Sequence, residues 1–473
     1  MPRLCGWVQR RCSFYTMYSA LSLILVIWSF FTGIVWFAAG SEFLLALNFL
    51  LAFFGALYIL RKKTGLDFSY PMLFLAAYFL LFFTYPLLTY VGMMEPWGSK
   101  DVRVIYLFLL NEGLCLFVLG YLVGGNLISR SWEARSFQMQ LSRINFLIAV
   151  GVAISLAGLA LIVLDIGPSR AISATRSLQK LETTPIFLVG MYMLFVSYPI
   201  WALLPLLKKR AMFLWMLILV PMDIFIFLVL KIRTPVIGHL FAFVTMLAYR
   251  EKFSLRMLSS RLRLNQKLRR VFLVGTLVLL VVLGISLRVI RGYLELYQRI
   301  DFSEVKQMIL DGIIFSFQYG DFGYAPIVYQ VIEQCNNTGF RLWGQSYYRI
   351  FFIWIPRAIW KSKPENTQRV VAKLLNPAGY ELGLTIPPGV VGDAYLNFGL
   401  YGIFVLFFIG VIFATIKFRN GFHYALFSSL SLPWVFHLAR GGFTNPLVIG
   451  VVMYLLSFGT AKFICSRISG EEI

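Results

Sequence analysis

The sequence predicts an all-α protein that crosses a membrane about twelve times and carries one large loop on the outer side. Of its 473 residues, 59% are hydrophobic and only 14% are charged, whereas soluble domains contain about 25% charged residues. Apolar runs of about 20 residues, long enough to cross a bilayer core, recur along the chain. The stretch 291–393 contains no such run and is too long for a simple connector.

Each predicted span is an apolar run bounded by polar or charged residues. In chain order, the predicted spans are 18–39, 43–60, 70–92, 104–127, 145–165, 185–207, 211–230, 235–249, 271–290, 394–416, 423–438 and 446–464. The domain organisation is therefore nine spans within 1–290, the loop 291–393, and three spans followed by a short tail within 394–473.

The distribution of basic residues predicts the orientation of the spans. If the N-terminus lies in the cytoplasm, the short inner segments hold most of the 43 Lys and Arg residues. The densest of these inner segments are 61–63, 208–210 and 250–270. Because cytoplasmic loops carry the excess of Lys and Arg, both termini are expected in the cytoplasm and the long loop outside. This topology and an anionic ligand explain the net charge of +22, so no nucleic acid partner is expected.

The chain lacks the sequence motifs that are typical of several classes of enzyme. The five cysteines are scattered without metal-ligand spacing. No P-loop, dinucleotide-binding fingerprint or HExxH motif occurs. We therefore expect neither a metal nor another cofactor. Cys335 is the only cysteine in a predicted outer loop, so no intrachain disulfide is expected there.

The second half of the outer loop has the composition of a binding surface. Short amphipathic helices are predicted at 306–317 and 325–333. From Gln345 onwards, aromatic residues alternate with cations, which suits a ligand that is both anionic and apolar. Prolines exclude one continuous helix in this stretch. Its central cations are Arg357, Lys361 and Lys363.

Two residues are candidates for a general base. Asp393 follows a Pro-Pro-Gly turn and directly precedes the tenth span, so it is either a base or the N-cap of that helix. His437 lies three residues before Arg440 at the outer end of the eleventh span, where both face the same side. A lone histidine is also commonly a structural group. Gly441 and Gly442 follow and would let a ligand approach the backbone closely.

Further charged residues lie at the ends of spans and within them. Arg288 and Arg291 end the ninth span, and Arg233 lies in an external turn. Arginine binds phosphate well, and the structural alternative is contact with lipid headgroups. Glu112 and Asp223 fall in mid-span, where each is either a hydrogen-bonding link between helices or part of a proton relay.

The chain resembles the Wzy-type O-antigen polymerases of Gram-negative inner membranes. One block that carries the resemblance is Ile355-Pro356-Arg357 with Trp360, Lys363 and Pro364. A second runs from Pro387-Pro388-Gly389 through Gly392-Asp393-Ala394-Tyr395 and Asn397-Phe398-Gly399 to Gly402. The third feature is the plan of many spans around one outer loop, which implies a GT-C-like fold.

The resemblance implies metal-independent glycosyl transfer on the periplasmic face, in lipopolysaccharide biosynthesis. The donor would be a growing glycan on undecaprenyl pyrophosphate, and the acceptor a new lipid-linked repeat unit. Asp393 would be the first candidate for the base and His437 the second. The phosphate-binding residues would be Arg233, Arg288, Arg291, Arg357, Lys361, Lys363 and Arg440.

Membrane lipids, a chain-length regulator and a repeat-unit flippase are the other expected partners. One alternative is an O-antigen ligase, which uses the same donor. A transporter or flippase of lipid-linked oligosaccharide is the other alternative, although such proteins usually show two related halves, which this sequence lacks.

Overall fold

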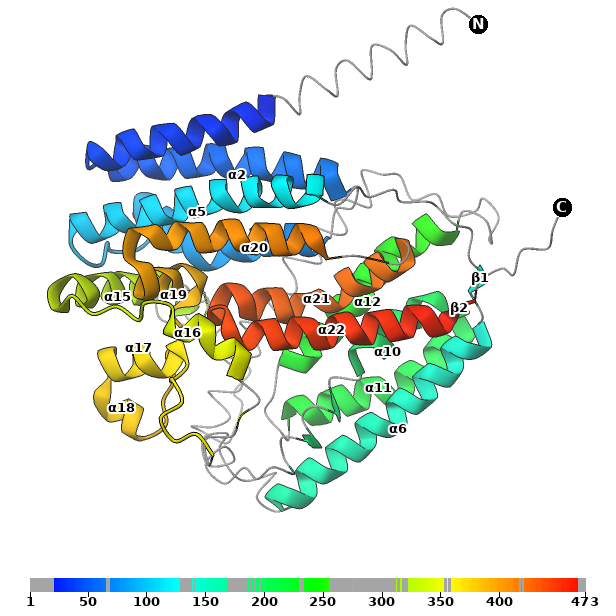
Figure 1. Cartoon of the computed structure of the whole chain (residues 1–473). Helices are drawn as coiled ribbons and strands as arrows, with labels where there is room; N and C mark the ends of the chain where they lie inside the picture. The colour runs from blue at the N-terminus through cyan, green and yellow to red at the C-terminus, as the bar shows by residue number, and fades with distance from the viewer. Residues whose placement is uncertain are drawn as a thin grey trace, which may run out of the picture. The chain divides into compact units, whose positions relative to one another are not determined.

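The structure is a computed structural model in which nearly all described residues are helical (Figure 1). The only sheet among them is an antiparallel pair of short strands, β1 (Gln138–Met139) and β2 (Cys465–Ser466). The predicted all-α class is therefore confirmed. The described residues are 21–64, 69–127, 138–139, 141–167, 186, 189–190, 193–194, 197–228, 234–254, 275, 312, 315–316, 322–352, 355, 359–416, 418 and 421–466.

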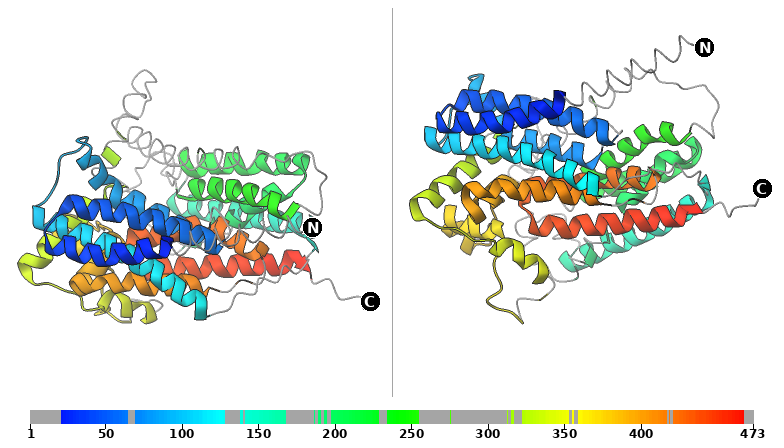
Figure 2. Two further views of the ribbon diagram at one scale, coloured as in Figure 1. Left: turned by 90° about the horizontal axis from the view of Figure 1, so that it is seen from above. Right: turned by 45° about the horizontal axis from the view of Figure 1, so that its top comes forward.

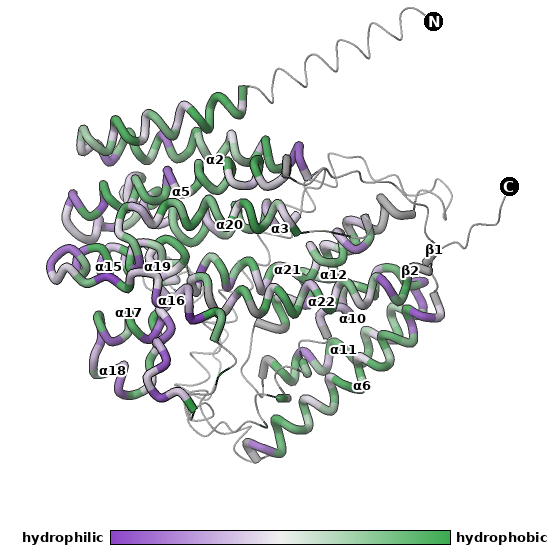
Figure 3. Tube along the Cα trace, in the orientation of Figure 1, coloured by the Kyte–Doolittle hydropathy of each residue, from purple (hydrophilic) through white to green (hydrophobic). Residues whose placement is uncertain are grey.

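Six described helices are long and apolar enough to cross a membrane, and Figure 3 shows their hydrophobic character. They are Leu21–Ala38, Glu42–Thr64, Tyr70–Tyr90, Lys100–Gly125, Ser142–Asp165 and Gly389–Thr415. Each coincides with a predicted span. Two shorter apolar helices, Val236–Leu247 and Ile449–Ile464, fall at the eighth and twelfth predicted spans. The ninth predicted span lies outside the described residues, apart from Gly275.

The chain divides into two compact units whose segments alternate along the sequence. Unit 1 comprises Met1–Ser131, Ser316–Lys417 and Trp434–Gly450, and unit 2 comprises Trp132–Phe315, Phe418–Pro433 and Val451–Ile473. Most of the predicted outer loop, from Ser316 onwards, thus belongs to the same unit as the first four predicted spans. Helices α21 (Gly421–Gly441) and α22 (Thr444–Ile464) contribute residues to both units.

The described part of unit 1 begins with the helix Leu21–Ala38 and contains long apolar helices as well as the short helices of the predicted loop. Its other elements before the loop are α2 (Glu42–Thr64), α3 (Tyr70–Tyr78), η1 (Phe79–Phe83), α4 (Thr84–Tyr90) and α5 (Lys100–Leu127). Those of the later stretch are α15 (Tyr324–Thr338), α16 (Gln345–Tyr348), η3 (Arg349–Phe352), α17 (Thr367–Leu375), α18 (Pro377–Glu381), α19 (Gly389–Phe398), η4 (Gly399–Gly402) and α20 (Ile403–Thr415). The predicted helix 325–333 is thereby confirmed within α15, whereas most of 306–317 lies outside the described residues.

Helices α5 and α20 pack side by side at the centre of unit 1 (Figures 1 and 2). Glycines bring their backbones together. A Cβ atom on Gly120 would lie 2.1 Å from the carbonyl oxygen of Phe407, and one on Gly410 would lie 2.1 Å from that of Phe117. Gly120 and Gly124 have the GxxxG spacing that allows membrane helices to approach closely.

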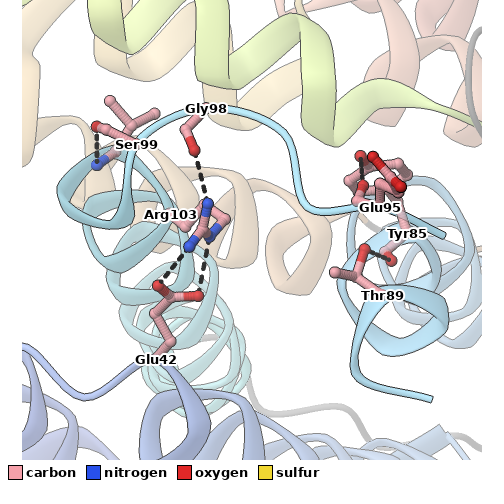
Figure 4. A network of polar contacts seen from close by, with 8 residues as sticks. Glu42, Tyr85, Thr89, Glu95, Gly98, Ser99 and Arg103 are labelled. Atoms are coloured by element: carbon pink, nitrogen blue, oxygen red, sulfur yellow. Dashed lines mark hydrogen bonds and ion pairs between the residues drawn. The ribbon is translucent and has the colours of Figure 1, made fainter. Parts of the chain in front are cut away.

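The first turns of α2 and α5 are joined by an ion pair (Figure 4). The Arg103 guanidinium donates from Nε to Glu42 Oε2 at 2.9 Å and from a terminal nitrogen to Oε1 at 3.0 Å. Its other terminal nitrogen donates to the carbonyl oxygen of Gly98 at 2.6 Å. Both helices therefore start at the same end of unit 1, as the alternation of predicted spans requires.

Replacing Arg103 by glutamine is expected to lower the stability of the protein by about 1 kcal/mol, because the pair is bidentate but only partly buried. Thermal unfolding of the purified protein in detergent measures the change. Lys100→Gln, which removes an exposed cation from the same helix, is the matched control. If the two variants had equal melting temperatures, the ion pair would contribute nothing.

Unit 2 contains a buried link between two helices. Its described elements include α6 (Leu141–Ile166), α10 (Ser197–Leu203), η2 (Leu204–Leu206), α11 (Lys209–Leu228) and α12 (Thr234–Ser254). Asp223 Oδ1 of α11 lies 2.8 Å from Nδ1 of His239 in α12. The His239 ring stacks on Trp201 of α10, with ring centroids 5.8 Å apart. This geometry favours the structural interpretation of Asp223, a hydrogen bond that joins helices.

Candidate functional site

The segment around Asp393 begins its helix earlier than the sequence predicts. Helix α19 begins at Gly389 with Pro388 at the N-cap, so Asp393 lies inside the helix. The N-cap interpretation of Asp393 is therefore wrong. Gly389 has a φ of +68°, and a Cβ atom there would lie 2.5 Å from the Phe82 ring. The helix can thus begin at this position only with glycine, and Asp393 is its fifth residue.

The Asp393 carboxylate is fully buried and accepts hydrogen bonds from separate segments of unit 1. Its Oδ1 atom accepts from the Thr367 hydroxyl at 2.7 Å and from the Ser346 hydroxyl at 3.3 Å. Its Oδ2 atom accepts from the backbone N–H of Phe443 at 3.1 Å. Asp393 therefore ties α19 to α17, to α16 and to the segment after α21. Such donors are what a buried carboxylate needs.

Asn397, one turn further along α19, extends this network and is also fully buried. Its amide nitrogen donates to the Ser346 hydroxyl at 2.8 Å and to Asp393 Oδ1 at 3.2 Å. Its amide oxygen accepts from the backbone N–H of Gly344 at 3.1 Å. Sequence reasoning gave Asn397 no role, although its spacing of four residues from Asp393 places both on one helical face.

The two glycines after Arg440 do allow a close backbone approach, but the approaching group is Asp393. Gly442 has a φ of +82°, and a Cβ atom there would lie 2.9 Å from Asp393 Oδ2. The carbonyl oxygen of Gly441 accepts from the Gln368 side chain of α17 at 3.2 Å. The end of α21 is therefore attached to both α17 and α19.

The predicted pair His437 and Arg440 lies at this end of α21, and both side chains are half-buried. The Nε atom of Arg440 donates to the hydroxyl of Tyr324, the buried first residue of α15. The guanidinium carbon also lies 6.0 Å from the centroid of the Tyr324 ring. His437 and Arg440 thus precede Gly442, whose backbone lies against Asp393, by five and two residues in the chain.

The two predicted lysines have different environments. Lys363 is buried, and its ammonium group donates to the carbonyl oxygen of Ile355 at 2.8 Å. Lys361 is exposed. Lys363 lies four residues before Thr367, so the segment that supplies a donor to Asp393 also holds a buried cation. The remaining predicted cations, Arg233, Arg288, Arg291 and Arg357, lie outside the described residues.

An aromatic groove lies beside the Asp393 network, with a volume of about 440 Å³. Its lining residues are Tyr347, Phe398, Tyr401, Phe404, Val405, Phe408 and Phe443. Tyr347 follows Ser346, and Phe443 supplies the backbone donor to Asp393. The groove and the network therefore share a wall, and the groove continues along α20. Sequence reasoning missed it, because its residues come from three distant stretches.

The polar and apolar parts of the site meet at Tyr347. Its ring stacks on Phe398 with centroids 5.8 Å apart. Burial raises the pKa of Tyr347 well above its usual value, and the negative charge of Asp393 raises it further. The phenol therefore stays protonated at neutral pH and can donate, but it does not act as a base there.

Unit 1 therefore holds a buried carboxylate with its donors and an adjoining aromatic groove, and the same unit contains His437 and Arg440 on α21 and the buried Lys363. Among the described residues, no group of three or more His, Cys, Asp or Glu side chains is arranged to hold a metal ion. Comparison of the chain with protein-family models, with curated proteins and with solved structures gave no match.

Proposed function

We propose that this protein is a surface-polysaccharide polymerase of the Wzy type, with about twelve spans and a GT-C-like fold. It joins repeat units carried on undecaprenyl pyrophosphate and releases undecaprenyl pyrophosphate at the periplasmic face of the bacterial inner membrane. One observation carries the proposal: the Asp393 network, the Arg440 end of α21 and the aromatic groove meet in unit 1. The substrate consists of sugars, a pyrophosphate and a long apolar chain. It requires polar groups for the sugars, a cation for the pyrophosphate and an apolar surface for the chain.

The arrangement of helix ends in unit 1 supports a site on one side of the membrane. The Glu42–Arg103 pair joins segments that both belong to predicted outer loops. Next to it, a Cβ atom on Gly98 would lie 3.7 Å from Tyr329 of α15. Helix α15 in turn binds Arg440 through Tyr324. The predicted outer loops and the loop helix α15 are therefore gathered at one end, as a periplasmic site requires.

The structure changes the order of preference between the two predicted bases. Asp393 has no exposed surface, and both of its oxygens accept hydrogen bonds from other segments of unit 1. A carboxylate in this state positions its neighbours, and a sugar hydroxyl would reach it only if the surrounding segments moved apart. We therefore assign positioning to Asp393 and proton acceptance to His437, which is only half-buried.

In the proposed reaction, His437 accepts the proton of the acceptor hydroxyl while its oxygen bonds to the anomeric carbon of the donor. The bond between that carbon and the pyrophosphate oxygen breaks, and the pyrophosphate leaves with the bonding electrons. Arg440 and Lys363 supply positive charge for the leaving group. Their contacts with Tyr324 and Ile355 hold the two side chains in place before the substrate arrives.

Reconstitution of the full chain tests the proposed function. The purified protein in bilayer nanodiscs receives undecaprenyl-pyrophosphate-linked repeat units without added divalent ions. We expect a ladder of longer glycans and free undecaprenyl pyrophosphate, and both are expected to be lost in His437→Gln. Transfer only to a lipid A core acceptor would identify a ligase instead. Movement of the substrate across the membrane of proteoliposomes without bond formation would identify a transporter.

The aromatic groove is expected to hold the apolar chain of the donor. Replacing Phe408 by alanine removes an aromatic wall, so it should raise the KM for a full-length polyprenyl donor about tenfold, equivalent to ~1.4 kcal/mol. A donor with a short prenyl chain should show little change. Phe54→Ala, at an exposed aromatic of α2 that is not part of the groove, is the control. Equal effects on long and short donors would argue against this role.

A further inference from the structure

A second cluster of buried polar side chains lies in unit 1, within the membrane helices. Asn111 and Glu112 of α5 and Ser29 of the helix Leu21–Ala38 are all fully buried. Asn48 of α2 is also buried and reaches the same place. The cluster therefore joins three helices that the proposed function leaves without a chemical role.

The hydrogen bonds of this cluster leave acceptors without donors. The Asn111 amide nitrogen donates to Glu112 Oε1 at 2.8 Å and to the backbone carbonyl of Ser29 at 3.2 Å. The Asn48 amide nitrogen donates to the same carbonyl at 2.7 Å. No hydrogen-bond partner among the described residues reaches Glu112 Oε2, Asn111 Oδ1 or the Ser29 hydroxyl oxygen.

The negative charge of the Glu112 carboxylate increases the energetic cost of these missing donors. A carboxylate in the apolar part of a membrane is strongly destabilised unless it is paired or neutralised. Arg103, on the same helix as Glu112, is already paired with Glu42 at the end of α5. No described Lys, Arg or His forms an ion pair with Glu112. A positive charge from outside the protein would satisfy the carboxylate.

The first helix is shaped to leave space for this carboxyl group. A Cβ atom on Gly33 would lie 1.9 Å from Glu112 Oε1 and 2.4 Å from the Asn111 amide nitrogen. Any residue other than glycine would therefore displace both side chains. The cluster thus packs closely against the first helix and holds three buried oxygens without donors, and oxygen atoms are the ligands that hard cations prefer.

We propose that Glu112, Asn111 and Ser29 bind a small monovalent cation, either a sodium ion or a proton, between α5 and the helix Leu21–Ala38. Glu112 Oε2 supplies the charge, and the Asn111 and Ser29 oxygens complete the site. Because the ion compensates the buried carboxylate, its binding stabilises the packing of the helices. This site is separate from the proposed glycosyl transfer and does not depend on it.

Thermal unfolding of the full chain in detergent tests the proposal. The melting temperature is measured in sodium chloride and in N-methylglucamine chloride at equal ionic strength, each over a range of pH. We expect sodium or acid to raise the melting temperature of the unmodified protein by several degrees. In Glu112→Gln, an amide of the same shape replaces the carboxylate and supplies its own donor, so the response should vanish. Asp101→Asn, at an exposed carboxylate of α5, should keep the full response.

The results separate the two ions. A stabilisation by sodium that is absent in Glu112→Gln identifies a sodium site. A stabilisation by acid without a preference for sodium, also absent in Glu112→Gln, identifies a proton. If the unmodified protein responds to neither ion, or if Glu112→Gln responds as strongly, the proposal is overturned.

Discussion

Replacing Asp393 by alanine is expected to abolish glycan elongation and to lower the stability of the protein by about 3–5 kcal/mol. The substitution leaves the Thr367 and Ser346 hydroxyls, the Asn397 amide and the Phe443 N–H without their common acceptor. Buried donors without partners each cost about 1–3 kcal/mol, although partial relaxation reduces the sum. Thermal unfolding and the nanodisc elongation assay measure the two effects.

A milder pair of variants separates positioning from proton transfer. Asp393→Asn keeps the shape of the side chain but replaces one carboxylate oxygen by an NH₂ group. This group cannot accept the hydrogen bonds that the oxygen accepted, so stability and elongation should fall together. His437→Gln should abolish elongation at nearly unchanged melting temperature. If Asp393→Asn instead kept its melting temperature and lost all elongation, the carboxylate would be the base and our assignment would be reversed.

Replacing Gly120 by alanine is the second substitution with a large expected effect. The new Cβ atom would lie 2.1 Å from the carbonyl oxygen of Phe407, so α5 and α20 must move apart along their contact. Overpacking of this kind typically costs about 1–3 kcal/mol, and backbone atoms cannot yield as a side chain does. We expect a loss of about 3 kcal/mol, measured by thermal unfolding, and a smaller yield of inserted protein.

Gly125 provides a matched control on the same helix. A Cβ atom there meets nothing within 4 Å. Alanine at this position should therefore stabilise α5 slightly, by about 0.5–1 kcal/mol, through its higher helix propensity. If Gly120→Ala were as stable as Gly125→Ala, the close contact between α5 and α20 would not contribute to the fold.

Most of the membrane helices were predictable because length and apolar composition alone define them. The predicted span 423–438 is an instructive case, since it contains several serines and Pro433. The structure forms a continuous helix from Gly421 to Gly441. The hydroxyls of Ser429 and Ser431 donate back to the carbonyl oxygens of Ala425 and Ser428, both at 2.8 Å. Serine satisfies its polarity within the helix in this way, so it does not end a buried span.

The partners of Asp393 were not predictable from the sequence. Ser346, Thr367 and Phe443 lie 47, 26 and 50 residues away from it. The Phe443 contact is made by a backbone N–H, which every residue other than proline possesses and which leaves no mark in a sequence. The Pro-Pro-Gly turn correctly indicated a break before the tenth span. It did not reveal that Gly389 itself begins the helix.

The interleaving of the two units has a consequence for biosynthesis. The Trp434–Gly450 stretch completes unit 1, yet the ribosome makes it after every other part of that unit. Phe443, whose backbone N–H donates to Asp393, is synthesised 50 residues later than Asp393 itself. A nascent chain that stops shortly after Lys417 would therefore contain the earlier helices of unit 1 but would lack the segment that supplies the Phe443 donor. The Asp393 carboxylate can therefore gain its Phe443 donor only after the ribosome has made the Trp434–Gly450 stretch.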